Sequence, residues 1–216
     1  MSRRQLLNIS GKNKSSFRGG IPVGKIVGIC GSPRKGGNTE QILTHCLNRA
    51  GELGAKTKLI TLYNKNIRGC IACMKCRETK DGKCYGRDDD FNAIADEVYS
   101  ADGLIVASPV YFSTPTPEIL AVLHRIGYVS RGNGGLLNGK AGAAIAVARH
   151  AGQNFTLAAM SFFFYINEMV QPGSTYWNVA FGRDKGDVMR DTEALDTVKK
   201  TAENMVELID KIRGRS

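Results

Sequence analysis

The sequence predicts an α/β protein built on a doubly wound, five-stranded parallel sheet with the strand order 2-1-3-4-5. Short, nearly continuous apolar runs, which are typical of strands buried on both faces, alternate with longer segments of helical periodicity. Parallel strands need long crossover connections, and the helical segments supply them. Because such crossovers are right-handed, few topologies remain, and this strand order fits the number of predicted elements.

The first apolar run shows why these runs are interpreted as strands. Lys25-Ile-Val-Gly-Ile-Cys30 is almost wholly apolar, and Gly31 ends it. Further runs of similar length and character follow along the chain. We therefore expect strands at residues 25–30, 57–62, 103–108 and 141–148, and a fifth strand that begins at Met169 and Val170.

The segments between these runs contain helix start signals. Asn38, with Gln41 three residues later, resembles a capping box, and Pro117 suits a first helical turn. The three aspartates at residues 88–90 offer an N-cap. Helices are accordingly expected over residues 39–50, from these aspartates to about residue 99, and over residues 117–125, 155–167 and 192–212.

Composition and charge limit the class of protein. Of the 216 residues, 42% are hydrophobic, and no apolar run approaches the roughly 20 residues of a membrane span. We expect one globular domain over residues 25–216, preceded by a flexible basic extension over residues 1–24. The net charge of +10 is not accompanied by interleaved aromatics or a nucleic-acid motif, so we expect no nucleic-acid partner. No export signal is evident, and the expected location is the cytoplasm.

Four of the six cysteines share the spacing C-x2-C-x2-C-x7-C, in a loop over residues 64–90 that follows the second strand. Thiolates this close together suit one [4Fe–4S] cluster. Structural zinc usually takes two ligand pairs with a longer spacer, but zinc, redox-active thiols and a lost cluster remain alternatives. Cys30 and Cys46 are interpreted as small buried hydrophobes. The predicted cluster ligands are Cys70, Cys73, Cys76 and Cys84.

A loop typical of phosphate binding follows the first strand. Gly31-Ser-Pro-Arg-Lys-Gly-Gly-Asn-Thr39 offers backbone N–H groups and a helix N-terminus to an anion. It contains neither the G-x-G-x-x-G fingerprint of dinucleotide sites nor the Gly-Lys-Ser/Thr of a Walker A loop. A mononucleotide such as FMN is therefore supported, and turn chemistry alone is the alternative.

Three segments together resemble the flavin-contacting loops of the NADPH-dependent FMN reductase family. They are residues 32–39, Ser108-Pro-Val-Tyr-Phe112 and Arg149-His-Ala-Gly-Gln153, after the first, third and fourth predicted strands. That family has a flavodoxin-like fold, in which ligands bind at the carboxyl ends of the strands. With the cysteine motif added, residues 25–212 resemble the iron–sulfur flavoprotein branch most closely.

The resemblance implies which residues contact FMN. The first loop would bind the phosphate, the second would flank the isoalloxazine ring, and the third would lie at the polar edge of the ring. The chemistry would reside at the flavin N5, so no catalytic side chain is expected. Ala151 departs from the glycine that is more usual in the third loop. The implied cofactor-binding residues are Ser32, Arg34, Gly36, Asn38, Thr39, Pro109, Val110, Tyr111, Phe112, Ser113, His150, Gly152 and Gln153.

The resemblance also implies a function. A flavin exchanges one or two electrons and a cubane cluster only one, so the chain would relay electrons through FMN and a [4Fe–4S] cluster. The expected donor is a ferredoxin-like carrier or NAD(P)H, and the expected acceptor is an oxygen species or a quinone. Family members form homodimers or homotetramers in which the two cofactors can approach across an interface.

Two alternatives remain open at this point. One is an NAD(P)H-dependent FMN or quinone reductase without a cluster. The other is a flavodoxin-type electron carrier that is not an enzyme. In either case the cysteine loop is expected on the same sheet edge as the phosphate loop, because it follows the second strand.

Overall fold

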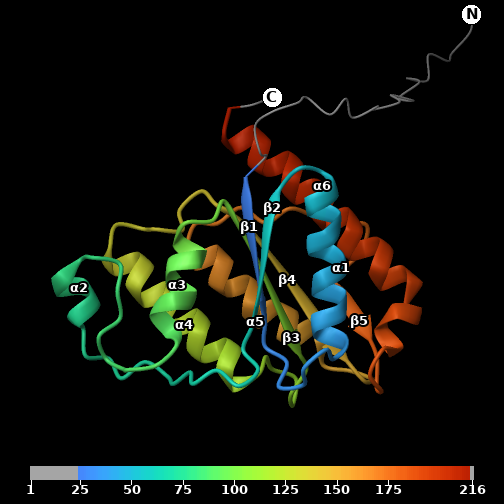
Figure 1. Cartoon of the computed structure of the whole chain (residues 1–216), viewed down its shortest axis with the longest axis horizontal. Helices are drawn as coiled ribbons and strands as arrows, with labels where there is room; N and C mark the ends of the chain where they lie inside the picture. The colour runs from blue at the N-terminus through green and yellow to red at the C-terminus, as the bar shows by residue number, and fades with distance from the viewer. Residues whose placement is uncertain (1–23, 215–216) are drawn as a thin grey trace, which may run out of the picture.

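The structure is a computed structural model that describes residues 24–214. In this part of the chain, five parallel strands form one sheet in the order β2-β1-β3-β4-β5, so the predicted topology is confirmed (Figure 1). The expected N-terminal extension lies outside the described residues, apart from Gly24. The strands are β1 (Lys25–Cys30), β2 (Lys56–Thr61), β3 (Gly103–Pro109), β4 (Ala141–Ala148) and β5 (Val179–Phe181).

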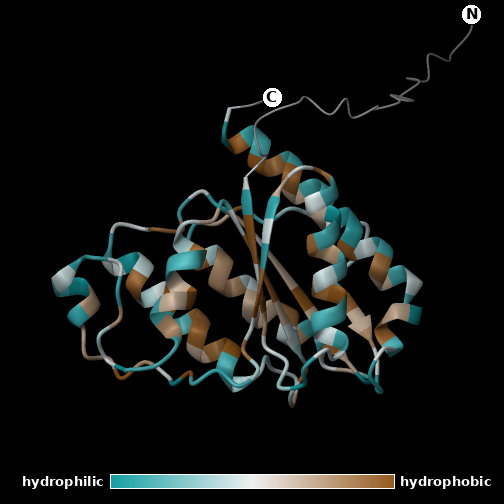
Figure 2. Ribbon diagram, in the orientation of Figure 1, coloured by the Kyte–Doolittle hydropathy of each residue, from teal (hydrophilic) through white to brown (hydrophobic). Residues whose placement is uncertain are grey.

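Helices cover both faces of the sheet. Helices α1 (Asn38–Glu52) and α6 (Thr192–Ile212) pack on one face. Helices α3 (Phe91–Tyr99), α4 (Pro117–Gly132) and α5 (Gln153–Ile166) pack on the other face. Figure 1 shows this three-layer arrangement, and Figure 2 shows hydrophobic residues on the helix sides toward the sheet. The two short helical segments are α2 (Lys75–Thr79) and the 3-10 helix η1 (Asp187–Arg190).

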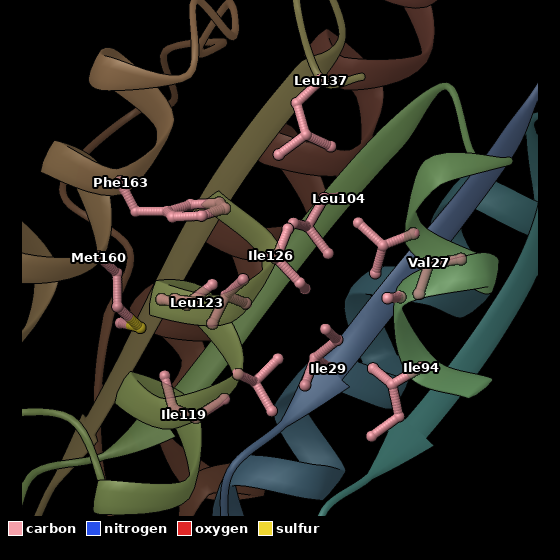
Figure 3. Close-up of a cluster of buried hydrophobic side chains, with 14 of the residues drawn as sticks. Val27, Ile29, Ile94, Leu104, Ile119, Leu123, Ile126, Leu137, Met160 and Phe163 are labelled. Carbon is pink, nitrogen blue, oxygen red and sulfur yellow. The ribbon is translucent and has the colours of Figure 1, made fainter. Parts of the chain in front are cut away.

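The apolar runs of the sequence become the middle of this sandwich. Alternate residues of a strand point to opposite faces, so Val27 and Ile29 contact the α3–α4–α5 layer while Ile26 and Cys30 contact α1 and α6. Figure 3 shows the first of these clusters, with Ile119, Leu123 and Ile126 of α4 packed against β1 and β3. Every residue of β4 is buried, which explains why its run shows no polar alternation.

Two predicted elements were placed wrongly. Val170 forms only an isolated bridge with Ala141, and the fifth strand is the later segment Val179–Phe181. Pro172 follows soon after Val170 and lacks the N–H that a ladder needs, so pairing does not extend there. Helix α4 continues past Arg125 to Gly132, because Ile126 and Val129 extend its buried face.

The expected capping box at Asn38 was also wrong. Asn38 is already the first residue of α1, Gly37 is the N-cap, and no side chain caps this end among the described residues. No helix in residues 24–214 has both the length and the apolar character needed to cross a bilayer.

Candidate functional site

A pocket opens at the carboxyl edge of the sheet, where parallel α/β proteins usually bind ligands. It encloses about 390 Å³ between the loops that follow β1, β3, β4 and β5. Seven of the predicted FMN contacts line it. They are Ser32, Arg34, Asn38, Thr39, Pro109, Val110 and Tyr111.

The loop after β1 is shaped by its own hydrogen bonds. The Ser32 hydroxyl accepts the N–H of Arg34 at 3.1 Å, and the N–H of Gly37 donates to the Arg34 carbonyl at 3.1 Å. Since no described side chain caps α1, the N–H groups of its first turn are left to a ligand. Gly36 adopts a φ of +65° and donates its N–H to Glu40 Oε2, so it turns the loop without lining the pocket.

Asn38 ties this loop to the segment after β5. Its amide nitrogen donates to the Asp184 carbonyl at 2.9 Å, and its Oδ1 accepts the N–H of Gly186 at 2.8 Å. The Asn38 side chain, which was predicted to bind the phosphate, therefore forms hydrogen bonds with the backbone of the protein. These bonds hold the loop after β1 against the segment after β5, and the two together form one wall of the pocket.

This wall brings in basic residues that the sequence analysis missed. Arg183 and Lys185 line the pocket beside Arg34, Lys35 and Arg149, and Asp184 is the one carboxylate in the lining. These residues were missed because the fifth strand was predicted to begin at Met169 and Val170, before its actual position. Had β5 been placed at Val179–Phe181, its carboxyl end would have pointed to the segment Arg183-Asp-Lys185.

The loop after β3 forms a tight turn at the rim of the pocket. Tyr111 and Thr114 exchange backbone hydrogen bonds at 2.9 and 3.0 Å, and Phe112 and Ser113 between them both have positive φ. Phe112 is fully exposed and, like Ser113, does not line the pocket as described. A bulky aromatic side chain in solvent at this rim is available to a flat ligand.

The loop after β4 packs against that turn. Gly152 has a φ of +90°, and a Cβ on it would come within 2.8 Å of Ser113 Oγ and 2.9 Å of Val110 Cγ1. Only glycine allows this close approach. His150 is exposed, and Gln153 is buried at the start of α5. Neither residue, nor Gly152, lines the pocket; its lining in this loop is Arg149.

A second cavity is lined by all four residues of the cysteine motif. Cys70 and Cys73 are exposed, Cys76 is half-buried and Cys84 is buried. Ala72 and Met74, between these cysteines, have φ of +53° and +60°, and the Ala72 N–H donates to Cys70 Sγ at 3.4 Å. Left-handed residues let a backbone N–H turn toward an anion, and the Ala72 N–H is turned toward a cysteine sulfur in this way. The cavity is lined by Cys70, Ile71, Ala72, Cys73, Met74, Cys76, Cys84, Tyr85, Gly86, Arg87, Arg125, Tyr128 and Val129.

The four thiols influence one another. Burial, followed by the charges of the other three cysteines, raises the pKa of the Cys76 thiol. Within residues 24–214, no three His, Cys, Asp or Glu side chains stand close enough together to hold a single metal ion. The thiols surround a cavity, which is the arrangement that a polynuclear centre with four thiolate ligands needs.

Cys84 is the most firmly held of the four. Asn92 accepts its N–H at 2.9 Å and donates to its carbonyl at 3.0 Å. Its Sγ accepts a hydrogen bond at 3.3 Å from Nη2 of Arg125, a buried residue of α4. No role for Arg125 was predicted from the sequence, because a lone arginine in a predicted helix normally lies at the surface.

The expectation that both sites share one sheet edge is not met in the single chain. The cysteine loop starts at the carboxyl edge but then packs against the far half of α4, and α2 lies at the outer margin of the molecule (Figure 1). Tyr128 stands eleven residues beyond Pro117, roughly 16 Å along the helix at 1.5 Å per residue. As described, the two cavities have no lining residue in common.

The other two cysteines lie in the core, as expected. Burial raises the pKa of Cys30 and of Cys46 to about 12. Both thiols therefore remain protonated at neutral pH and are unsuited to metal binding or nucleophilic chemistry.

Comparison with known proteins relates the chain to flavoproteins. The family model described as NADPH-dependent FMN reductase matches residues 24–184. An iron–sulfur flavoprotein of Methanocaldococcus jannaschii is 33% identical over 201 residues, which cover 88% of this chain and 99% of that protein. An iron–sulfur flavoprotein of Methanosarcina thermophila is 34% identical over 197 residues, which cover 88% of this chain and 97% of that protein.

Solved structures agree with the fold. RosB, crystallised with the bound intermediate 8-demethyl-8-formylriboflavin-5'-phosphate, superimposes with a TM-score of 0.72 at 13% identity, covering 88% of this chain and 80% of RosB. An archaeal flavodoxin superimposes with a TM-score of 0.55 at 13% identity, covering 88% of this chain and 99% of the flavodoxin. At these identities the likeness concerns the fold alone.

Proposed function

Because this chain belongs to the NADPH-dependent FMN reductase family, we propose that it is an iron–sulfur flavoprotein that relays electrons between FMN and a [4Fe–4S] cluster. The family makes it a flavin-dependent oxidoreductase. The observation that carries the proposal is the cavity lined by four cysteines, in a chain whose carboxyl-edge pocket is lined by seven of the predicted FMN contacts. When bound, the flavin exchanges one or two electrons and the cluster one at a time.

The carboxyl-edge pocket suits FMN in charge and shape. Arg34 and the uncapped N-terminus of α1 would hold the phosphate, since both favour an anion. Tyr111, half-exposed at the rim, and Val110 would give the isoalloxazine ring an apolar wall. No acid, base or nucleophile is required of the protein, whose task is to bind and orient the ring.

The cysteine cavity suits a cluster by its donor set. Cys70, Cys73, Cys76 and Cys84 would supply the four thiolates. The N–H of Ala72 and the guanidinium of Arg125 would offset part of the negative charge of the centre. The exposed side of Cys70 and Cys73 would let a ferredoxin-like carrier approach, and the final acceptor would be an oxygen species or a quinone.

Anaerobic purification followed by a visible spectrum tests both cofactors. We expect one FMN and about four iron and four sulfide ions per chain, because a cubane has that composition. Cys84→Ala should lose iron and sulfide. Cys46→Ala, a matched change at a buried core thiol, should keep them. FMN without iron or sulfide in the wild type would contradict the cluster, zinc in its place would favour a structural site, and absence of flavin would contradict the whole proposal.

A second candidate is a nicotinamide-dependent reductase that needs no cluster. The excess charge of the pocket favours it, since five basic residues exceed what one phosphate monoester requires. The surplus cations would attract the phosphates of NADPH as they approach the flavin. NADPH oxidation by iron-free, FMN-loaded protein would support this candidate. Dependence of all turnover on a reduced ferredoxin would exclude it.

A further inference from the structure

Arg125 is a basic residue whose environment is unusual. Its side chain is fully buried in the middle of α4, although arginine is almost never buried without partners. Its Cζ lies 4.0 Å from the ring centroid of Phe91, which covers the guanidinium on one face. The residue also lines the cysteine cavity.

The two terminal nitrogens of the Arg125 guanidinium bind different groups. Nη1 donates to Asp89 Oδ2 at 2.6 Å and to the Arg68 carbonyl at 3.0 Å. Nη2 donates to Cys84 Sγ at 3.3 Å. Asp89 and Cys84 therefore bind different nitrogens of the planar guanidinium, and the Cys84 sulfur accepts a hydrogen bond from a positively charged group. Nε has no hydrogen-bond partner within the described residues.

Asp89 stays ionised in this setting. Burial acts to raise the pKa of its carboxyl, but the hydrogen bond from Arg125 and those from the N–H groups of Arg68 and Phe91 outweigh it, and the pKa lies below its usual value. Both side chains of the pair are fully buried. The pair is thus a fixed dipole beside Cys84.

We propose that Arg125 is a positioning residue that raises the reduction potential of the cluster through its hydrogen bond to Cys84, with Asp89 setting how much of its charge the cluster experiences. The inference rests on the proposed function, because it assumes a cluster on Cys84. Reduction adds one electron to the cluster, taken from the reductant, and moves no proton. Hydrogen bonds to cluster sulfurs and nearby positive charge both stabilise the more negative, reduced form.

Asp89 makes the proposal testable through the sign of the effect. Removing the carboxylate leaves the guanidinium charge unopposed, so Asp89→Asn should raise the potential. Replacing both partners, in the double variant Asp89→Asn with Arg125→Gln, removes the positive charge without stranding a buried carboxylate, so the potential should fall below wild type. A residue that served only to hold the loop would give both variants the same sign, or none.

The experiment is an anaerobic redox titration of the purified holoprotein, followed by the electron paramagnetic resonance signal of the reduced cluster. We expect the reduced-to-oxidised ratio of the double variant, at a fixed applied potential, to be at least tenfold lower than wild type, which is about 59 mV for a one-electron couple. Arg49→Gln is the matched control. Arg49 also pairs with a carboxylate, Glu203, but on the opposite face of the sheet, and its loss should leave the potential unchanged.

The outcomes separate this inference from the proposed function. A wild-type protein without iron would overturn both. An iron-replete wild type with all variants at the same potential would overturn the role of Arg125 alone. If the double variant does not retain its cluster, Arg125→Lys takes its place, because lysine keeps the charge but cannot reach all three partners. A lowered potential in Arg125→Lys together with a raised one in Asp89→Asn supports the proposal, and unchanged potentials refute it.

Discussion

Some side chains of the carboxyl-edge pocket hold its loops together, and others are free to contact a ligand. The Asn38 amide forms hydrogen bonds with the backbone of the segment after β5. Arg34 lines the cavity, and its side chain has no hydrogen bond within the described residues. The two residues are four positions apart, Arg34 in the loop after β1 and Asn38 at the first position of α1. From the sequence, both residues were predicted to bind the FMN phosphate. In the structure, the hydrogen bonds of Asn38 to the backbone leave Arg34 as the side chain available to a ligand.

Arg34→Gln should weaken FMN binding without unfolding the protein. A charge-assisted hydrogen bond to phosphate contributes about 1.5–3 kcal/mol, which corresponds to a Kd roughly 10- to 150-fold higher. Flavin fluorescence quenching on titration of apoprotein measures this Kd. Arg190→Gln, at a residue that is exposed on η1 and outside the pocket lining, serves as the control and should leave the Kd unchanged.

At the scale of elements, the pocket depends on how closely α4 approaches the end of β1. The Thr116 hydroxyl, just before α4, donates to the Gly31 carbonyl at 3.0 Å, and the Thr116 N–H donates to Ser108 Oγ at 3.0 Å. The first bond joins the loop after β3 to the end of β1, and the second ties that loop back to β3 itself. The gap between them has no room for a side chain at position 31.

Gly31→Ala should therefore destabilise the fold. An added Cβ would lie 2.1 Å from Ile119 Cγ1 and 2.8 Å from Thr116 Oγ1, so α4 or the loop must move. Overpacking of this kind costs about 1–3 kcal/mol, measured as a lower free energy of unfolding in urea. Gly51→Ala is the contrasting change. Its Cβ meets only Thr57 Oγ1, at 3.9 Å, and within α1 alanine should stabilise by up to about 1 kcal/mol.

Helix α3 is joined to β1 and β2 by an acid-sensitive contact. Hydrogen bonds from Lys25 and then Lys58 lower the pKa of Glu97 from 4.5 to about 2. A depressed pKa means that the contribution to stability is complete above the unfolded value and is lost as pH falls toward 2. Urea unfolding at several pH values should show wild type and Glu97→Gln converging as the pH approaches 2.

The control for this pH dependence is Glu193→Gln. Glu193 is exposed at the start of α6 and far along the chain from the α3 contact. Its substitution should leave the difference in stability between pH 7 and pH 2 close to that of the wild type. A Glu97→Gln curve parallel to wild type through the acid range would contradict the assignment.

The whole molecule presents an apolar strip on α5 that the single chain leaves uncovered. Phe162 and Tyr165 are 71% and 80% exposed, and Ile166 beside them is also exposed. Exposed apolar patches of this kind typically mark association surfaces. They support the expectation of a homodimer or homotetramer, in which the carboxyl-edge pocket of one chain could lie near the cysteine cavity of another.

Light scattering coupled to size exclusion should give a mass that is an integer multiple, two or four, of 23.4 kDa. Phe162→Asp should shift the protein toward the monomer, because it buries a charge in the interface. Phe155→Asp, an equally exposed position near the start of α5, is the matched control and should keep the oligomer. A wild-type monomer at micromolar concentration would contradict this prediction.

The fold was predictable because its evidence is local. Strands buried on both faces must be continuously apolar, and β1, β3 and β4 show this in their own residues. The three-residue β5 is too short to have any period, so its position depends on contacts that the sequence does not display. Because β5 was not placed correctly, the basic segment that follows it was not predicted to line the pocket.

The candidate site was predictable in part for the same reason. Cysteine spacing is visible in the sequence, and so is a glycine-rich turn after a strand. The buried pair of Arg125 and Asp89 is not, because its members stand 36 residues apart and each resembles a surface residue on its own. Of the aspartates expected to cap α3, Asp90 is the N-cap residue, but its side chain accepts the N–H of Asn66 and not one from α3. Asp89 accepts the N–H of Phe91 and also pairs with Arg125, and the sequence does not show this second role.

The contact of Asp89 with Arg68 has a consequence for how such a chain can diverge. The Arg68 N–H donates to Asp89, 21 residues later, so the two ends of the cysteine segment are held side by side just before α3. A flexible segment closed in this way becomes costlier by only about 0.6 kcal/mol when its length doubles. Insertions between Cys76 and Cys84 should thus be tolerated, while changes at the closing residues should not. We therefore expect the length of the cysteine segment to be able to vary as long as the contacts among Arg68, Asp89 and Arg125 are kept.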